Sequence, residues 1–155
     1  MVKTKFLQIC KKCGAKCCKF GGTDFTKKEM QGVLKANHKN FFVRINDNHY
    51  ELKCKKGICP YLSKENTCSI HKVRPLMCRC YPVWPFFENK KRLSIIYNCP
   101  ARARLSKKEM YSLIKKANLV NSDLAEGYLT SSKLPKSDLR LIEKRFDQFE
   151  HETLK

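Results

Sequence analysis

The chain has 155 residues, ten cysteines and a formal net charge of +19, from 33 Lys and Arg against 14 Asp and Glu. This length fits one small domain and is too short for a full barrel enzyme or for two substantial domains. No segment approaches the ~20 apolar residues that span a bilayer, so we expect no membrane partner.

The chain opens with a cysteine cluster in residues 1–24, followed by the turn-forming pair Gly21-Gly22. The apolar stretch within residues 1–10 is interrupted by Gln8 and is too short for a secretory signal, so we expect a cytoplasmic protein. In a reducing cytosol, clustered cysteines are typical of metal sites rather than of a disulfide framework. The cluster reads Cys10-x2-Cys13-x3-Cys17-Cys18.

The spacing within this cluster suggests how its sulfurs are arranged. Cys10 and Cys13 fit a short loop whose turn directs both sulfurs at one point, as in zinc and iron–sulfur sites. Cys17 and Cys18 are adjacent, so we expect their sulfurs to diverge, one toward this site and the other toward a neighbouring site.

Residues 26–53 predict a helix and a hairpin. Thr26-Lys-Lys-Glu29 is a capping box, and the apolar residues after it predict a helix ending near Asn37. Residues 41–45 and 50–53 predict two strands joined by the turn-forming residues 46–48.

Residues 54–100 hold six cysteines and five of the six prolines, which favours irregular loops over long regular elements. We expect Pro75, Pro82 and Pro85 to fix these loops. One strand is predicted at 93–97, and it leads to Cys99, which could return to close a site.

The tail, residues 101–155, predicts helices. Ser106-Lys-Lys-Glu109 is a second capping box before an apolar stripe, and residues 122–129 predict a short helix. Pro135 and Ser137 begin a final helix, and we interpret its stripe as core packing. That stripe is Leu139, Ile142, Phe146 and Phe149.

These elements predict a small α+β fold and a single domain over 1–155. Residues 1–100 form an irregular, cysteine-rich metal-binding core with short β-strands, flanked by helices, and 101–155 form a C-terminal helical extension.

Three later motifs carry a resemblance to a known family. They are Cys59-x-x-Leu62, Cys68-Ser-Ile-His71 and Arg74-Pro-x-x-Cys78-Arg-x-Tyr81-Pro82. With the cluster at the start, they resemble the YkgJ-like family of cysteine-cluster proteins, described as a zinc- or iron-chelating domain. The resemblance covers roughly residues 10 to 100.

The resemblance implies a metal or iron–sulfur site of eight thiolates, which suffice for two four-ligand sites or for one site with spare sulfurs. Cys54 and Cys80 lie outside the family pattern and read as extra ligands, free thiols or a redox pair. His71 stands where similar chains carry Tyr or His, which argues against an obligatory ligand. The implied ligands are Cys10, Cys13, Cys17, Cys18, Cys59, Cys68, Cys78 and Cys99.

Arg74 and Arg79 each have two interpretations: a guanidinium that offsets thiolate charge, or an ordinary ion pair or backbone-carbonyl contact. Trp84, Phe86 and Phe87 read as core packing or shielding of the site, with stacking on nucleic-acid bases as the weaker alternative.

The ligand set fits either an iron–sulfur cluster or Zn²⁺, and the Cys-Pro pairs at Cys59 and Cys99 favour iron–sulfur slightly. The favoured function is metal binding in electron transfer, redox sensing or metal handling, with a protein or redox partner.

Two other functions stay open. One is a zinc-stabilised basic module that binds nucleic acid, although the lysines are dispersed along the chain. The other is an accessory part of an enzyme resembling flagellin lysine methylases. No glycine fingerprint of a nucleotide fold and no catalytic residues are identified in the sequence.

Overall fold

The computed structural model describes residues 2–88, 91–122, 124, 135–147 and 151–154. Helices, 3₁₀ turns (η) and strands alternate along these residues. In chain order they are α1 (Val2–Cys13), η1 (Lys16–Lys19), α2 (Lys27–Lys35), β1 (Phe42–Asn46), β2 (His49–Leu52), η2 (His71–Val73), α3 (Leu76–Arg79), β3 (Val83–Glu88), β4 (Lys91–Tyr97), η3 (Arg102–Arg104), α4 (Lys107–Ala117), α6 (Lys136–Asp147) and β5 (His151–Leu154).

The predicted helix and hairpin are confirmed as α2 and β1–β2. Thr26 Oγ1 accepts a hydrogen bond from the Glu29 N–H at 3.2 Å, and Glu29 Oε2 accepts one from the Thr26 N–H at 2.9 Å. These bonds satisfy backbone donors that a helix start leaves unpaired. The helix ends at Lys35, close to the expected Asn37, which has a left-handed φ of 62°.

A second sheet, ordered β3-β4-β5, corrects the expectation of irregular loops before the predicted strand at 93–97. β4 was predicted, whereas β3 was not, because Pro85 was expected to fix a loop. Since β3 lies at the edge of the sheet, a proline can stand in it without breaking the ladder to a second neighbour. The tail likewise contains β5, which pairs with β4 and was not predicted as a strand.

The capping box at Ser106 is confirmed, and it begins α4. At the other end of this helix, the Arg92 guanidinium of β4 donates hydrogen bonds to the carbonyls of Ala117 and Val120 at 3.2 and 2.8 Å. Carbonyls at a helix end lack partners within the helix, so this contact fastens α4 to the sheet.

The last predicted helix is confirmed as α6, with Ile142 buried. Phe149 and the side chain of Phe146 lie outside the described part of the chain, as does most of the helix expected over 122–129. Within that stretch Ser122 and Leu124 are helical.

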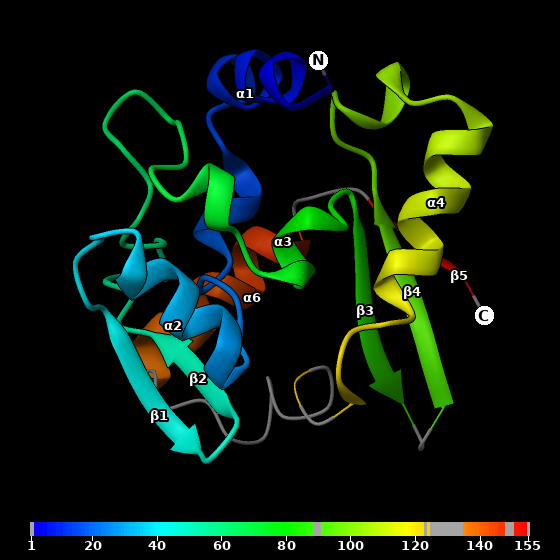
Figure 1. Cartoon of the computed structure of the whole chain (residues 1–155). Helices are drawn as coiled ribbons and strands as arrows, with labels where there is room; N and C mark the ends of the chain where they lie inside the picture. Colours follow the sequence, from blue (N-terminus) through cyan, green and yellow to red (C-terminus); the bar gives the residue numbers. More distant parts are fainter. Residues whose placement is uncertain (1, 89–90, 123, 125–134, 148–150, 155) are drawn as a thin grey trace.

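Two hydrophobic clusters organise these elements, one around α2 and the hairpin and the other around β3, β4 and α4. Trp84 packs against the second cluster, which confirms its core role, while the side chains of Phe86 and Phe87 are not described. Figure 1 shows the two halves on either side of α3. The first cluster is Phe25, Val33, Leu52, Cys54, Tyr61 and Ile70, and the second is Met77, Cys80, Val83, Ile96, Ala117, Val120 and Leu124.

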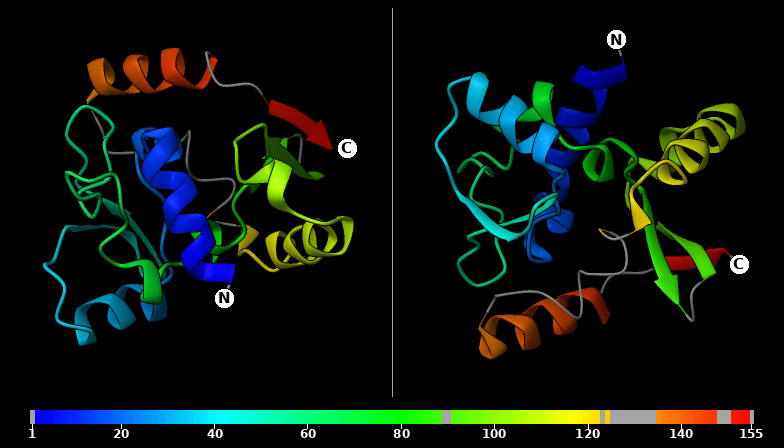
Figure 2. Two further views of the ribbon diagram at one scale, coloured as in Figure 1. Left: turned by 90° about the horizontal axis from the view of Figure 1, so that it is seen from above. Right: turned by 60° about the horizontal axis from the view of Figure 1, so that its bottom comes forward.

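The expected small α+β fold is therefore confirmed. α6 lies on the outside of the molecule, on the side away from α2 and α4 (Figure 2). No helix within the described ranges is both long and apolar enough to cross a membrane. The division at residue 100 stays a prediction.

Candidate metal centre

The first two predicted ligands lie in the last turn of a helix, which corrects the loop expected at Cys10-x2-Cys13. Residues three apart on a helix share one face, so α1 also brings these two side chains together. Gly14 and Ala15, with φ of 81° and 49°, end the helix, and the Ala15 N–H donates to the Cys10 carbonyl at 2.9 Å. The apolar spacing of Val2, Phe6 and Ile9 is the sequence signal that could have predicted α1.

Cys17 and Cys18 follow in η1, a 3₁₀ turn in which successive side chains point about 120° apart. The side chains of Cys17 and Cys18 act on each other. This interaction is the largest cause of a raised pKa at Cys17 and of a lowered pKa at Cys18, because it favours a proton on the first and a thiolate on the second.

The other four predicted ligands come from the second half of the cysteine region. The Cys59 N–H donates to the Cys18 carbonyl at 2.8 Å, which holds that loop against η1. Cys68 lies in a β-bridge with Leu62, Cys78 is on α3, and Cys99 follows β4.

Backbone N–H groups lie near three of these sulfurs. The backbone of Tyr61 acts on Cys59, that of Ile70 on Cys68, and that of Ala101 and Arg102 on Cys99, where the Arg102 N–H donates to the Cys99 carbonyl at 2.9 Å. Burial raises the pKa of each thiol, and these backbone groups oppose it because they favour the thiolate. Such N–H···S bonds suit a sulfur that carries negative charge or binds a metal.

All eight predicted ligands lie close enough to interact electrostatically with at least one other. Cys18 is at the centre, because its charge raises the pKa of Cys10, Cys68 and Cys78, in each case after the larger effect of burial. Cys13 and Cys99 act on Cys10 in the same way. The two halves of the cysteine pattern are therefore adjacent in space.

Burial favours the protonated form of Cys10 and Cys68 in the absence of metal. It raises the pKa of Cys10 and of Cys68 to about 11, and nearby thiolates add to the effect. The Arg74 guanidinium opposes it at Cys10, Cys68, Cys78 and Cys18, as expected for a cation that offsets thiolate charge.

Arg74 is held in place by its Nε, which donates to the His71 carbonyl at 3.0 Å. Arg79 acts instead on Cys80, outside the predicted set. Of the two arginines, Arg74 is therefore the one placed against the predicted ligands.

A pocket of about 340 Å³ opens beside part of this centre. Cys10, Cys13, Cys17 and Cys99 line it, whereas the other four predicted ligands do not. Most of the remaining wall is apolar, and the cationic side chains in it are Arg74, Arg79 and Lys116.

Two buried hydroxyls meet sulfurs of the centre. Neither Thr23 Oγ1 nor Tyr81 Oη has a hydrogen-bond partner among the described residues. The nearest acceptors that act on them are sulfurs: the Thr23 hydroxyl influences the pKa of Cys78, and the Cys17 sulfur influences that of Tyr81. A hydroxyl left without a partner costs free energy when buried, and a thiolate is the acceptor that each lacks.

The structure separates Cys80 from the predicted set, whereas Cys54 lies close enough to the predicted ligand Cys59 to raise its pKa. Cys80 is fully buried in the second hydrophobic cluster, with Lys116, Arg79 and Glu29 as its charged neighbours. Cys54 donates its thiol hydrogen to the Gly21 carbonyl at 3.2 Å, and its charged neighbours are carboxylates.

Gly22 packs so closely on Cys54 that a Cβ there would lie 2.9 Å from the Cys54 sulfur, and its φ is 77°. The backbone of the predicted turn at Gly21-Gly22 therefore passes directly against the Cys54 side chain. This contact explains why a residue without a side chain is needed there.

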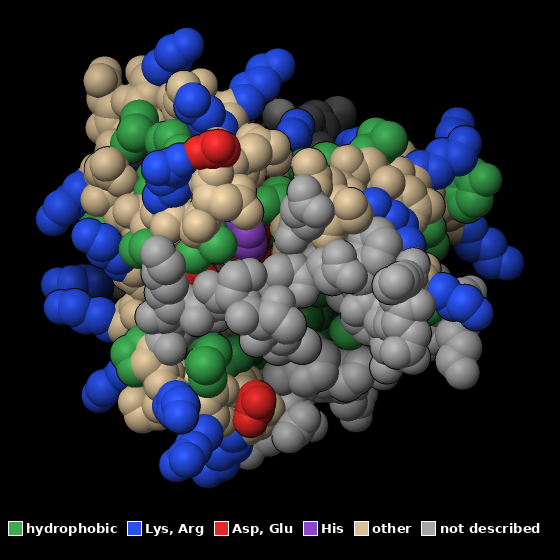
Figure 3. All heavy atoms as spheres, turned by 90° about the horizontal axis from the view of Figure 1, so that it is seen from below, with side chains coloured by type: hydrophobic (Ala, Val, Ile, Leu, Met, Phe, Trp, Pro, Cys, Tyr) green, Lys and Arg blue, Asp and Glu red, His purple; other side chains and the backbone are tan. Residues whose placement is uncertain are grey.

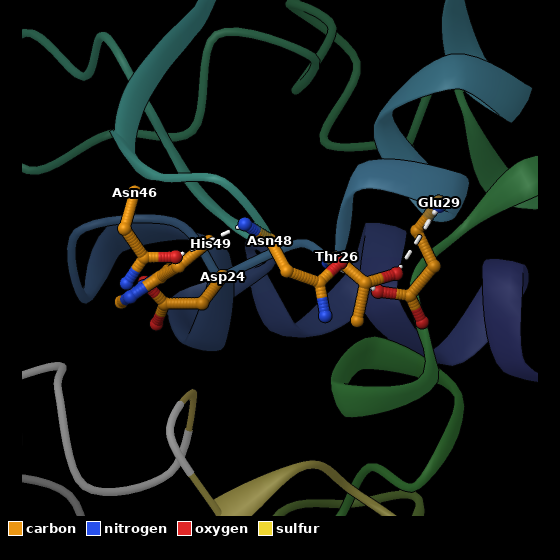
Figure 4. A network of polar contacts seen from close by, with 6 residues as sticks. All are labelled: Asp24, Thr26, Glu29, Asn46, Asn48 and His49. Atoms are coloured by element: carbon orange, nitrogen blue, oxygen red, sulfur yellow. Dashed lines mark hydrogen bonds and ion pairs between the residues drawn. The ribbon is translucent and has the colours of Figure 1, made fainter.

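A buried His–Asp pair that the sequence analysis did not identify lies near Cys54. His49 Nε2 and Asp24 Oδ1 are 2.7 Å apart, and both side chains are almost fully buried. Figure 4 shows the two side chains facing one another beside the hairpin turn, with the α2 capping box next to them. The pair joins β2 to the segment before α2, and burial of Asp24 raises its pKa despite the histidine.

The sulfurs are gathered but are not already set in coordinating positions. Within the described residues, no three Cys, His, Asp or Glu side chains form a group that could hold a metal ion as they stand. The donor chemistry nevertheless fits a thiophilic metal, given the thiolate-only set, the N–H donors at sulfur and the two hydroxyls without other partners. The ligand list stays a prediction, and binding would draw the loops together.

Clustered cysteine side chains with backbone groups close to their sulfurs are typical of the class of proteins that bind metals through cysteine. The sequence model of the family CxxCxxCC, "Putative zinc- or iron-chelating domain", matches residues 9–111. The chain therefore belongs to this family, and the suspected resemblance is confirmed. Searches of curated proteins and of solved structures returned no match.

Proposed function

We propose that the chain binds an iron–sulfur cluster or zinc through its eight family cysteines and serves in electron transfer, redox sensing or metal handling. The observation that carries the proposal is the spatial convergence of Cys10–Cys18 with Cys59–Cys99, two halves of a pattern that are far apart in sequence. The family description, chelation of zinc or iron, supports it independently.

Of the two metals, we propose iron–sulfur for the native cell. All eight ligands are thiolates, and proline follows Cys59 and Cys99 as it follows ligands in ferredoxin loops. N–H···S bonds and a guanidinium such as Arg74 stabilise added negative charge, which favours the reduced state of a cluster. When bound, such a cluster supplies one-electron chemistry.

Anaerobic purification tests this choice directly. We expect a coloured protein with iron and acid-labile sulfide in equal amounts, whose visible absorption changes reversibly on reduction. Colourless protein with stoichiometric zinc and without labile sulfide would overturn the iron–sulfur proposal and leave a zinc protein.

The pocket supports an anionic partner for this centre. Arg74, Arg79 and Lys116 outnumber the single carboxylate, Glu109, in the wall where four predicted ligands are accessible, so this wall carries a net positive charge. A redox partner with an acidic docking surface would be complementary to this charge, and its association would weaken with salt.

Nucleic-acid binding is the alternative that the charge of +19 favours. Figure 3 shows Lys and Arg side chains spread around the visible face rather than gathered in one stripe. A gel shift with RNA and DNA at several salt concentrations discriminates the two functions. A tight, salt-dependent shift would support the alternative.

A further inference from the structure

The pocket divides the eight predicted ligands into two sets of four. Cys10, Cys13, Cys17 and Cys99 line it, and we name them the pocket group. The remaining four are the loop group, because they come from η1, the loop after β2 and α3. The loop group is Cys18, Cys59, Cys68 and Cys78.

The pocket group is connected within itself. Cys10 and Cys13 share a face in the last turn of α1, and both interact electrostatically with Cys99. Cys17 is next to Cys10 and completes the set. Its sulfur also influences the pKa of the buried Tyr81 hydroxyl.

The loop group is connected through Cys18. The Cys59 N–H donates to the Cys18 carbonyl at 2.8 Å, so the backbone fixes these two residues together. The Cys18 thiolate interacts electrostatically with Cys59, Cys68 and Cys78. Thr23, whose hydroxyl is also buried, influences the pKa of Cys78 in this group.

The junction between the groups is the Cys17–Cys18 pair. The electrostatic contacts that join one group to the other run through Cys17 or Cys18. Cys17 and Cys18 are adjacent in a 3₁₀ turn and act on each other, and Cys18 also interacts with Cys10 and Cys17 with Cys78, so the two groups are in contact at this pair. Four thiolates are a complete ligand set for one Zn²⁺ or one cluster.

We infer that the chain has two separate four-thiolate metal sites, the pocket group and the loop group, placed side by side by the adjacent ligands Cys17 and Cys18. This inference rests on the proposed function, and it decides between the two-site and one-site alternatives that the sequence left open. The Arg74 guanidinium, which interacts with Cys10 and with Cys18, Cys68 and Cys78, lies against both sites. The pocket group is the site that opens to the cavity.

Cobalt titration of the reduced, metal-free full chain counts the sites. Co²⁺ replaces zinc in tetrahedral thiolate sites and makes them visible by absorption. We expect two equivalents to bind to the unaltered protein. Cys99→Ser removes a ligand of the pocket group and Cys68→Ser one of the loop group, so each variant should bind one equivalent.

Matched variants keep the result independent of one substitution. Cys10→Ser should reproduce Cys99→Ser, Cys59→Ser should reproduce Cys68→Ser, and the pair Cys68→Ser/Cys99→Ser should bind no cobalt in a thiolate site. Circular dichroism of each cobalt-loaded variant checks that the remaining site still folds the chain.

One equivalent in the unaltered protein, or loss of all cobalt from both single variants, overturns the two-site inference while leaving the proposed function standing. Absence of any thiolate-to-cobalt absorption in the unaltered protein overturns the proposed function itself. A single variant that loses both equivalents while its matched partner loses one contradicts the assignment of residues to groups.

Discussion

Cys78 and Cys80 are two residues apart at the end of α3, yet their surroundings differ completely. Cys78 interacts with Cys18 and Cys68, whereas Cys80 is enclosed in the second hydrophobic cluster. Substitution by alanine should therefore separate a ligand from a core residue. We expect Cys78→Ala to lose the metal of the loop group and part of the fold, because metal binding and folding are coupled in small thiolate domains.

Cys80→Ala is the matched control. Removing its buried sulfur should cost about 1 kcal/mol of packing free energy and leave the full metal content. Metal analysis and urea unfolding measure the two effects. Equal metal loss in both variants would show that Cys80 is a ligand.

The raised pKa values predict how metal binding depends on pH. Burial raises the pKa of Cys10 and of Cys68 to about 11, so these thiols are protonated at neutral pH without metal, and protons must leave on binding. The apparent zinc affinity should therefore rise from pH 6 to pH 9 and keep rising above ~8.5, where unperturbed thiols would level off. Competition with a chelator, corrected for its own protonation, measures this, and a plateau near pH 8 would contradict it.

At the scale of the element, the two capping boxes have similar sequences but differ in the contacts that their glutamates make. Glu29 and Glu109 both stand at the third position of their helices and accept the N–H of the capping residue. Glu29 Oε1 also accepts the Leu76 N–H at 2.8 Å, at the start of the helix that carries Cys78.

This second bond predicts a larger cost for one glutamate. Glu29→Ala should destabilise the chain by about 1.5 kcal/mol more than Glu109→Ala, because it also leaves a backbone donor without its charged acceptor. Urea unfolding at a fixed free zinc concentration compares the two variants. Equal destabilisation would mean that the Leu76 contact adds nothing.

The sequence predicted elements whose signals are local. Capping boxes fixed the starts of α2 and α4, and strand alternation around 46–48 fixed the hairpin. Prediction from the sequence failed for elements that form because of contacts with distant parts of the chain. β3 can contain Pro85 only because that strand lies at the edge of the sheet. β5 forms only because β4 provides a strand for it to pair with.

The candidate site shows the same limit. The family pattern gave the eight cysteines, but their division into two groups depends on the direction of side chains in η1 and on the pocket. Thr23 and Tyr81 carry no motif, so their contact with sulfurs could be found only in space.

At the scale of the whole molecule, the C-terminal helix fastens the cysteine loops together. Arg145 on α6 donates to the carbonyls of Lys19 and Lys56 at 2.8 and 2.7 Å. Asp138 accepts the Lys56 N–H at 3.1 Å, and Ile142 is packed close to Gly57. These loops carry Cys18 and Cys59, while the helix lies outside residues 9–111 that the family model matches.

Arg145→Met tests whether this helix supports the centre. The variant keeps an apolar stem but loses both bonds to the loops, so we expect the chain to be destabilised by about 1.5 kcal/mol. Metal should then pass to a chelator several-fold faster, because the loops that hold Cys18 and Cys59 separate more readily. Arg140→Met, an exposed position on the same helix, is the control for lost charge and for metal release. Identical release rates in the two variants would show that α6 packs beside the loops without holding them.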